Sequence, residues 1–129
     1  YYFAGRGFGQ GQPGDCCVDT AYQLVDVSSY GADIDAGKAY LELSARMTTW
    51  SGDDQPEFRV ELLDAADQII DWGRSSVRTS SSVKNWESIV MDGFLPSGVR
   101  SIKVYIGGER KAGGDNDVYF DDVSLNLLY

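Results

Sequence analysis

The sequence predicts an all-β fold, a two-sheet antiparallel β-sandwich with about eight strands. Three observations predict this class. Apolar and polar residues alternate with a period of two along most of the chain, turn residues separate the alternating segments, and no window shows a helical stripe. The chain has 129 residues, 43% of them hydrophobic, which suits a single domain with a buried core.

The clearest strands have one apolar and one polar face. Odd positions are apolar in Lys38–Met47, and even positions are apolar in Glu57–Leu62 and Arg100–Ile106. The remaining strands are expected at Tyr22–Val27, Asp67–Trp72, Ser75–Thr79, Trp86–Met91 and Val118–Leu127. The segment Gly31–Gly37 is bracketed by glycines and holds at most one helical turn.

The order of these strands predicts where the connections lie. If successive strands run antiparallel, the connections at 28–37, 64–67 and 92–99 fall at one end of the sandwich, and those at 1–20, 48–56, 73–85 and 107–116 at the other. The second group holds the longer and chemically less common loops, so we expect the functional end there. We expect one domain spanning residues 1–129, with the glycine-rich segment 1–20 packing on the sandwich.

Charge and composition exclude several classes of function. The net charge of −9 argues against partners rich in phosphate, such as nucleic acids or anionic membranes, and suits calcium or neutral sugars. The chain has no histidine, which excludes His-based catalytic triads and zinc sites of the usual Cys/His type, so we do not expect an enzyme. No apolar run approaches the roughly 20 residues that span a bilayer.

The two cysteines, Cys16 and Cys17, are adjacent. Neighbouring Cα atoms lie about 3.8 Å apart, whereas an ordinary disulfide needs roughly 4.4–6.8 Å. The pair is therefore reduced, joined in a strained vicinal ring, or bonded to another chain.

The acidic segment near the C-terminus predicts a β-bulge and a calcium site. Apolar residues occupy even positions up to Phe120 and odd positions from Val123 onward, so a bulge at Asp121–Asp122 would absorb the slip. A bulge that aims carboxylates inward suits a hard cation with oxygen ligands. The candidate calcium ligands are Asp115, Asp117, Asp121 and Asp122. The alternative is an acidic turn that faces solvent and binds no metal.

The loop that begins at Trp50 predicts a sugar site. An aromatic ring on a loop can stack on the apolar face of a sugar, while neighbouring polar side chains bond its hydroxyls. The candidate contacts are Trp50, Asp53, Asp54, Arg110 and Asn116. In the alternative interpretation Trp50 covers the end of the core. Trp72 and Trp86 lie within strand patterns, and we expect both in the core.

Several segments together resemble a known family. The ending Asp117–Leu125, the strands Thr20–Val27 and Gly37–Ala45, the turn Glu61–Asp67 and the strand Leu95–Val104 are similar to those of galactose-binding-like jelly-roll domains, which include several families of bacterial carbohydrate-binding modules. The likeness spans about residues 18–128 and extends to the sugar-binding region of F-box proteins. These motifs specify the fold more closely than the ligand.

The resemblance implies a function and a metal. It implies a non-catalytic, lectin-like carbohydrate-binding module, secreted or at the cell surface, with a glycan or polysaccharide as partner. It also implies a structural calcium between the N-terminal segment and the last strand, held by Asp121 or Asp122 and by carbonyls before Asp19. The Glu-containing opening of those families is not recognisable in Tyr1–Gly14.

A second function comes from the two ends of the chain. Tyr1–Phe3 and Leu127–Tyr129 are apolar, and exposed apolar ends can add a strand to a neighbour's sheet. The chain would then be a structural or adhesive subunit of an extracellular assembly, such as a filament or surface layer, that self-associates.

Overall fold

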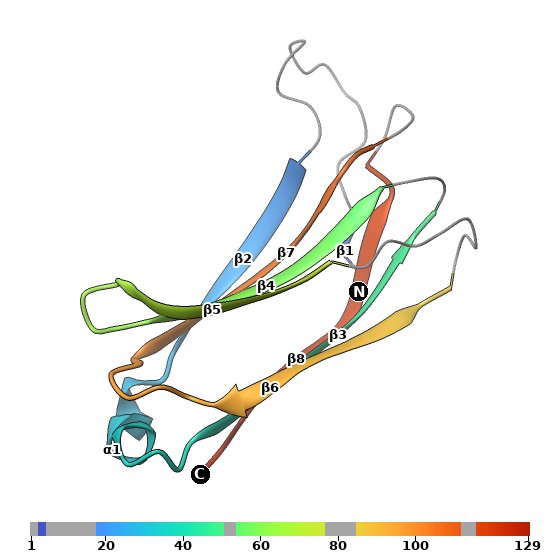
Figure 1. The fold of residues 1–129 in the computed structure, drawn as a ribbon. Helices are drawn as coiled ribbons and strands as arrows, with labels where there is room; N and C mark the ends of the chain where they lie inside the picture. The colour runs from blue at the N-terminus through green and yellow to red at the C-terminus, as the bar shows by residue number, and fades with distance from the viewer. Residues whose placement is uncertain (1–2, 5–17, 51–53, 77–84, 112–115) are drawn as a thin grey trace.

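A computed structural model describes residues 3–4, 18–50, 54–76, 85–111 and 116–129, which form two packed sheets and one short helix (Figure 1). The strands are β1 (Phe3–Ala4), β2 (Val18–Asp26), β3 (Tyr40–Thr49), β4 (Gln55–Leu63), β5 (Ile69–Ser76), β6 (Glu87–Phe94), β7 (Ser101–Glu109) and β8 (Val118–Leu128). A 3₁₀ turn, η1 (Ser28–Tyr30), leads into helix α1 (Gly31–Asp35). No helix in the described part of the chain is long and apolar enough to cross a membrane.

The two sheets have the strand order of a jelly roll. One sheet is β1-β8-β3-β6 and the other is β2-β7-β4-β5, and all pairs are antiparallel. Among the described strands, only β4 and β5 follow each other within one sheet. The predicted all-β, two-sheet sandwich is therefore confirmed.

The connections alternate between the two ends of the sandwich, as the sequence predicts. Helix α1, the β4–β5 turn and the β6–β7 connection lie at one end, near the C-terminus (Figure 1). Backbone hydrogen bonds connect three segments at this end. The Arg100 carbonyl accepts from the N–H of Val27, and the Arg100 N–H donates to the carbonyl of Leu63. We call the opposite end, where β3, β5 and β7 finish and β4, β6 and β8 begin, the loop end.

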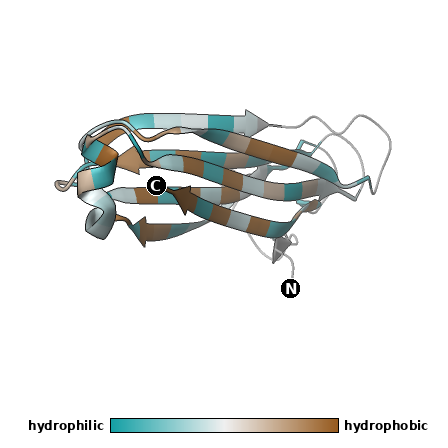
Figure 2. Ribbon diagram, turned by 90° about the horizontal axis from the view of Figure 1, so that it is seen from below, coloured by the Kyte–Doolittle hydropathy of each residue, from teal (hydrophilic) through white to brown (hydrophobic). Residues whose placement is uncertain are grey.

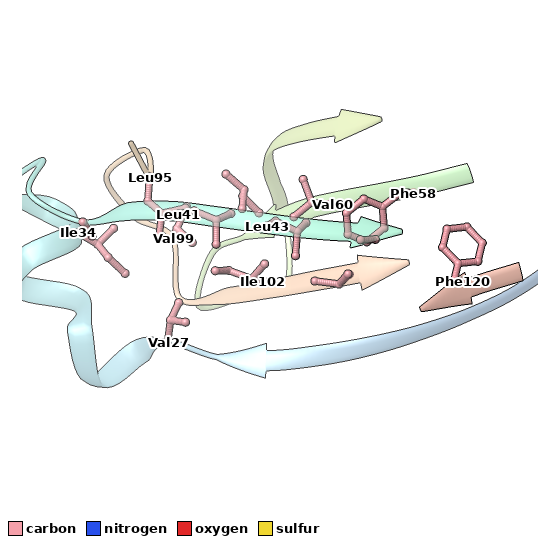
Figure 3. Close-up of a cluster of buried hydrophobic side chains, with 14 of the residues drawn as sticks. Val27, Ile34, Leu41, Leu43, Phe58, Val60, Leu95, Val99, Ile102 and Phe120 are labelled. Carbon is pink, nitrogen blue, oxygen red and sulfur yellow. The ribbon is translucent and has the colours of Figure 1, made fainter. Parts of the chain in front are cut away.

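The core fills the space between the sheets, where the predicted inward residues meet. The hydropathy of successive residues alternates along the strands (Figure 2). Leu41 and Leu43 of β3 and Phe120 of β8 lie across from Phe58 and Ile102 of the second sheet, and all five are buried (Figure 3). The alternation in these strands is confirmed.

At the loop end the sheets approach closely at Gly108 of β7. A Cβ atom at this position would lie 2.4 Å from Cγ2 of Val118 and within 2.9 Å of two more of its atoms. Asn116, just before Val118, donates a side-chain hydrogen bond to the Gly108 carbonyl at 2.9 Å. Only a residue without a Cβ atom at position 108 allows β7 and β8 to pack this closely without a shift of either strand.

An ion pair fastens the helix end of the sandwich. The Arg100 guanidinium donates to both carboxylate oxygens of Asp35, at 3.2 and 2.6 Å, and the N–H of Gly98 donates to the same carboxylate at 2.8 Å. The hydrogen bond from Arg100, followed by that from Gly98, lowers the pKa of Asp35 to about 2. The pair joins α1 to the β6–β7 connection.

The predicted bulge is present, but its carboxylates face outward. The pairing of β8 with β3 shifts register between Ser44 and Arg46, and Asp122 adopts a left-handed φ of 51°. Asp121 lies opposite Arg46, which is on the exposed face of β3, and Asp122 forms an exposed ion pair with Arg46 at 3.7 Å. The expectation that the bulge aims carboxylates inward is therefore wrong.

Two tryptophans also differ from the sequence expectation. Trp72 is 61% exposed on the outer face of its sheet, and Trp86 is exposed just before β6. The prediction that both lie in the core is therefore wrong. The pairing of β5 with β4 sets Trp72 opposite the outward-facing Glu61, and Trp86 lies before the first paired residue of β6. The expected strands at 67–72 and 75–79 both overlap one strand, β5, which ends at Ser76, and residues 77–79 lie outside the described part of the chain. The sequence does not predict β1.

Candidate functional site

At the loop end, two of the predicted sugar contacts are buried and hold the strand ends together. Asp54 is 1% exposed, and its two carboxylate oxygens accept the backbone N–H groups of Lys111 and Asp117 at 2.7 and 2.8 Å. Asn116 is also buried and bonds to Gly108. Both side chains therefore organise the loop end from within, and neither is placed to contact a glycan directly.

The other predicted contacts are less uniform. Trp50 is 52% exposed, and its backbone N–H donates to the Asp117 carbonyl at 2.9 Å. Arg110 is half-buried beside the end of β7. Asp53 lies outside the described residues, as do Cys16–Cys17 and the glycine-rich segment before them. Trp50 is thus exposed enough for sugar stacking, whereas Asp54 and Asn116, two of the polar contacts predicted beside it, are buried.

The predicted calcium ligands do not converge in the described residues. Asp121 accepts the N–H of Asp122 at 2.9 Å, and Asp122 pairs with Arg46. The ladder with β3 continues to Asp117, four residues before Asp121, so the two residues are about 13 Å apart along extended chain. Residues 3–4, 18–50, 54–76, 85–111 and 116–129 contain no cluster of three or more acidic, Cys or His side chains that could hold a metal. Asp115 lies outside these ranges, and calcium binding stays a prediction.

A different surface brings together side chains that can bind a ligand. The outer face of the β2-β7-β4-β5 sheet carries two rows of directly opposed residues. One row is Leu24, Lys103, Glu61 and Trp72, and the next is Tyr22, Tyr105, Arg59 and Arg74. We call these eight residues the polar–aromatic face. They combine aromatic rings with both signs of charge on one face of one sheet.

Tyr105 is the centre of the polar–aromatic face. The guanidinium carbon of Arg59 lies 3.9 Å from the centroid of its ring, and Lys103 Nζ lies 4.9 Å from that centroid. The Tyr105 hydroxyl donates to Glu61 at 2.8 Å. A hydrogen bond to Tyr105 raises the pKa of Lys103, aided by the nearby Glu61 carboxylate, so Lys103 is a cation at neutral pH.

Ion pairs hold the remaining charged groups of this region. Arg59 lies 3.4 Å from Glu61, and Arg74 lies 3.1 Å from Glu57, which is one row further toward the loop end. Each of these charged groups has an oppositely charged neighbour, which favours one arrangement of the polar groups before any ligand arrives.

The exposed rings lie at the two edges of the polar–aromatic face. Tyr22 on β2 is 64% exposed, and its ring is tilted by 46° against that of Tyr105 at 5.6 Å. Trp72 lies on β5 at the opposite edge. Three inter-strand spacings separate β2 from β5, which is about 14 Å. The charged groups of Lys103, Glu61 and Arg59 lie between the two rings.

The sequence analysis did not predict this face, although the outward residues of two strand segments pointed to it. In Glu57–Leu62 and Arg100–Ile106 the outward positions include Arg59, Glu61, Lys103 and Tyr105. These are long charged or aromatic side chains that can bind a ligand, whereas small polar side chains would suffice for contact with solvent. Each strand alone contributes only two of these residues. Pairing of β7 with β4 assembles them into one surface.

Comparison with known proteins gives the fold and no family assignment. No family model and no curated protein matches the chain. The enzymatically active domain of tailspike protein 4 from bacteriophage CBA120 has a similar structure, with a TM-score of 0.63, 11% identity, and coverage of 86% of this chain and 14% of that one. A chain from infectious bursal disease virus has a TM-score of 0.59 and 15% identity over 98% of this chain and 30% of its own.

A carbohydrate-binding module of family 4 is also similar. Its TM-score is 0.51, with 20% identity over 84% of this chain and 61% of the module. The chain thus spans less than two thirds of each of these three structures. The likeness places this protein among β-sandwiches that resemble carbohydrate-binding modules and viral jelly-roll domains.

Proposed function

We propose that this chain is a non-catalytic, extracellular carbohydrate-binding module whose glycan site is the polar–aromatic face. The observation that carries the proposal is the pair of exposed rings, Tyr22 and Trp72, at opposite edges of one regular sheet face. Aromatic rings offer flat apolar surfaces for the C–H faces of sugars, and the fixed charged groups between them can bond hydroxyls.

The spacing favours a chain of sugars over a single one. The strands that carry the two rings are about 14 Å apart, and the two residues lie in successive rows, so one monosaccharide cannot contact both rings. An extended oligosaccharide that crosses the strands would stack on Tyr22 and Trp72 and pass over Lys103 and Glu61. Each ring then contributes independently to the affinity.

The charge of the face favours a neutral glycan. Arg59 and Arg74 are paired with Glu61 and Glu57, and Lys103 lies among Tyr22, Tyr105 and Glu61. An anionic sugar would gain little from cations that already have partners, and it would meet a protein of net charge −9. The similarity in fold to a carbohydrate-binding module supports the same function.

The test is a glycan array followed by calorimetric titration of the best oligosaccharide. We expect Trp72→Ala and Tyr22→Ala each to weaken binding by about tenfold or more, because each removes one stacking surface. Trp50→Ala is the matched control, since Trp50 is similarly exposed but lies at the loop end. Loss of binding in Trp50→Ala, with Trp72→Ala and Tyr22→Ala unchanged, would move the site to the loop end.

The array also tests the class of function. No binding by the folded wild-type protein to any glycan would refute the proposal. Incubation with a bound oligosaccharide should leave it uncleaved, because the proposal includes no reaction. Release of shorter sugars by the purified protein would contradict the non-catalytic assignment.

A further inference from the structure

Strands β2 and β8 belong to different sheets and lie along the same edge of the sandwich, where the space between the sheets reaches solvent. A groove of about 510 Å³ runs between them. Val123 and Leu125 of β8 form one wall, Ala21 and Val25 of β2 form the other, and the buried Leu43 is at its base. Val123 is 45% exposed although its strand phase points it between the sheets. The groove is therefore a part of the core that reaches solvent.

Among the residues that the structure describes, one side of the β8 backbone also has little strand pairing. Strand β8 pairs with β3 on one side, and on the other side it pairs with β1 only at Tyr119 and Phe120. Within the described residues, no strand pairs with that side of β8 from Asp121 to Leu128. A row of backbone donors and acceptors therefore faces outward beside an apolar groove, and such an edge is a template for a further strand.

The described segment Val123–Leu128 lacks two of the features that usually prevent strand addition, charged side chains and proline. The inward positions Val123, Leu125 and Leu127 are apolar, and Ser124 and Asn126 between them are small and polar. The charges of Asp121 and Asp122 are confined to the bulge at one end of the segment.

We propose that this edge of β8 pairs antiparallel with β8 of a second copy of the chain. The pairing continues the position that β1 occupies beside Tyr119 and Phe120. With a two-fold axis at Leu125, Val123 of one copy lies opposite Leu127 of the other, and Ser124 lies opposite Asn126. Apolar residues then meet apolar residues, and polar residues meet polar ones.

Two features favour a second copy as the occupant. The axis stands perpendicular to the sheet, so the grooves of both copies meet and each covers the apolar opening of the other. Each copy carries a net charge of −9, but the paired segment is uncharged and the bulges lie at opposite ends of the joined strands, which limits repulsion. Tyr22 of β2 lines the groove and also belongs to the polar–aromatic face, whereas Trp72 and Glu61 lie away from this edge. Val123 and Ser124 are not part of the polar–aromatic face, so variants at these positions test the dimer separately from glycan binding.

Sedimentation velocity over about three orders of magnitude in concentration tests the proposal. The wild-type chain should show a reversible monomer–dimer equilibrium. Val123→Lys should weaken the dimer by about 100-fold or more, because each copy would place an ammonium group in the closed groove. Ser124→Lys is the matched control: it puts the same charge on the outer face of the same strand and should weaken the dimer far less.

Hydrogen exchange of the wild-type chain gives a second test that needs no variant. In the monomer, amides of β8 that point away from β3 exchange fast, so protection alternates along Val123–Leu127. In the dimer, the outward amides near Leu125 also become protected as concentration rises. A wild-type chain that stays monomeric throughout, or a dimer without new protection in β8, would overturn the proposal.

Discussion

Replacing Gly108 by alanine tests the closest approach between the two sheets. The new Cβ atom would lie 2.4, 2.8 and 2.9 Å from three atoms of Val118. Carbon atoms in contact prefer about 3.5–4.0 Å, so the strands must separate by about 1 Å. Val118 is fully buried, and Asn116 just before it is bonded to the Gly108 carbonyl, so β8 cannot move without disturbing the loop end.

The magnitude follows from these contacts. Adding a methyl group to a packed core costs roughly 1–3 kcal/mol, and three contacts below 3.0 Å place Gly108→Ala near the upper limit, at about 3 kcal/mol. For a chain of 129 residues, 1 kcal/mol shifts Tm by about 4 °C, so we expect Tm to fall by about 12 °C.

Urea unfolding followed by circular dichroism measures the change in free energy. Gly93→Ala is the matched control, because Gly93 is also in a strand, and no atom lies within 4 Å of a Cβ placed there. Its stability should change by no more than about 0.5 kcal/mol. The m-value should be unchanged in both variants, since the exposed surface on unfolding is the same.

A double variant links the effect to Val118. Val118→Ala removes both γ carbons, including the one at 2.4 Å, and leaves Cβ at 2.8 Å. The cost of Gly108→Ala should therefore be smaller, by about 1 kcal/mol, when measured in the Val118→Ala background. Equal stability of Gly108→Ala and wild type would refute the reasoning, because it would mean that β7 and β8 have room for a side chain.

Three further predictions concern the helix end, the core and the bulge. Arg100 holds the pKa of Asp35 at about 2, below its ordinary value of 3.8. The ion pair therefore stabilises the fold fully above about pH 5, and this stabilisation is lost as the pH falls from about 4 to 2. The Tm of Asp35→Asn should be lower than that of wild type at pH 7, and the two Tm values should converge near pH 2. A constant difference in Tm across that range would contradict this account. Phe58→Ala should destabilise by about 3–5 kcal/mol in urea unfolding, since Phe58 is fully buried between the sheets, and a loss below about 1 kcal/mol would show that the core collapses around the deletion. If calcium supports the fold, chelator should lower Tm, added calcium should restore it, and Asp121→Ala or Asp122→Ala should abolish that response; identical melting with and without chelator would count against a structural calcium.

The sequence by itself determined the class of fold and much of its detail. The alternation in β3, β4 and β7 identified the inward side chains of those strands, such as Leu43, Phe58 and Ile102. The phase slip between Phe120 and Val123 located the bulge. These are local properties: the period of a strand is two wherever it packs, so a few neighbouring residues suffice to reveal it.

Only the tertiary structure decided what lies on each surface. Asp54 is buried because its carboxylate meets backbone N–H groups from residues 57 and 63 positions later in the chain. Trp72 faces solvent because β5 pairs with β4 in the register that sets Trp72 opposite Glu61. Rows such as Tyr22, Tyr105 and Arg59 exist only once three strands are aligned. Register depends on the pairing of the whole chain, and a shift of one residue would turn each of these side chains to the other face.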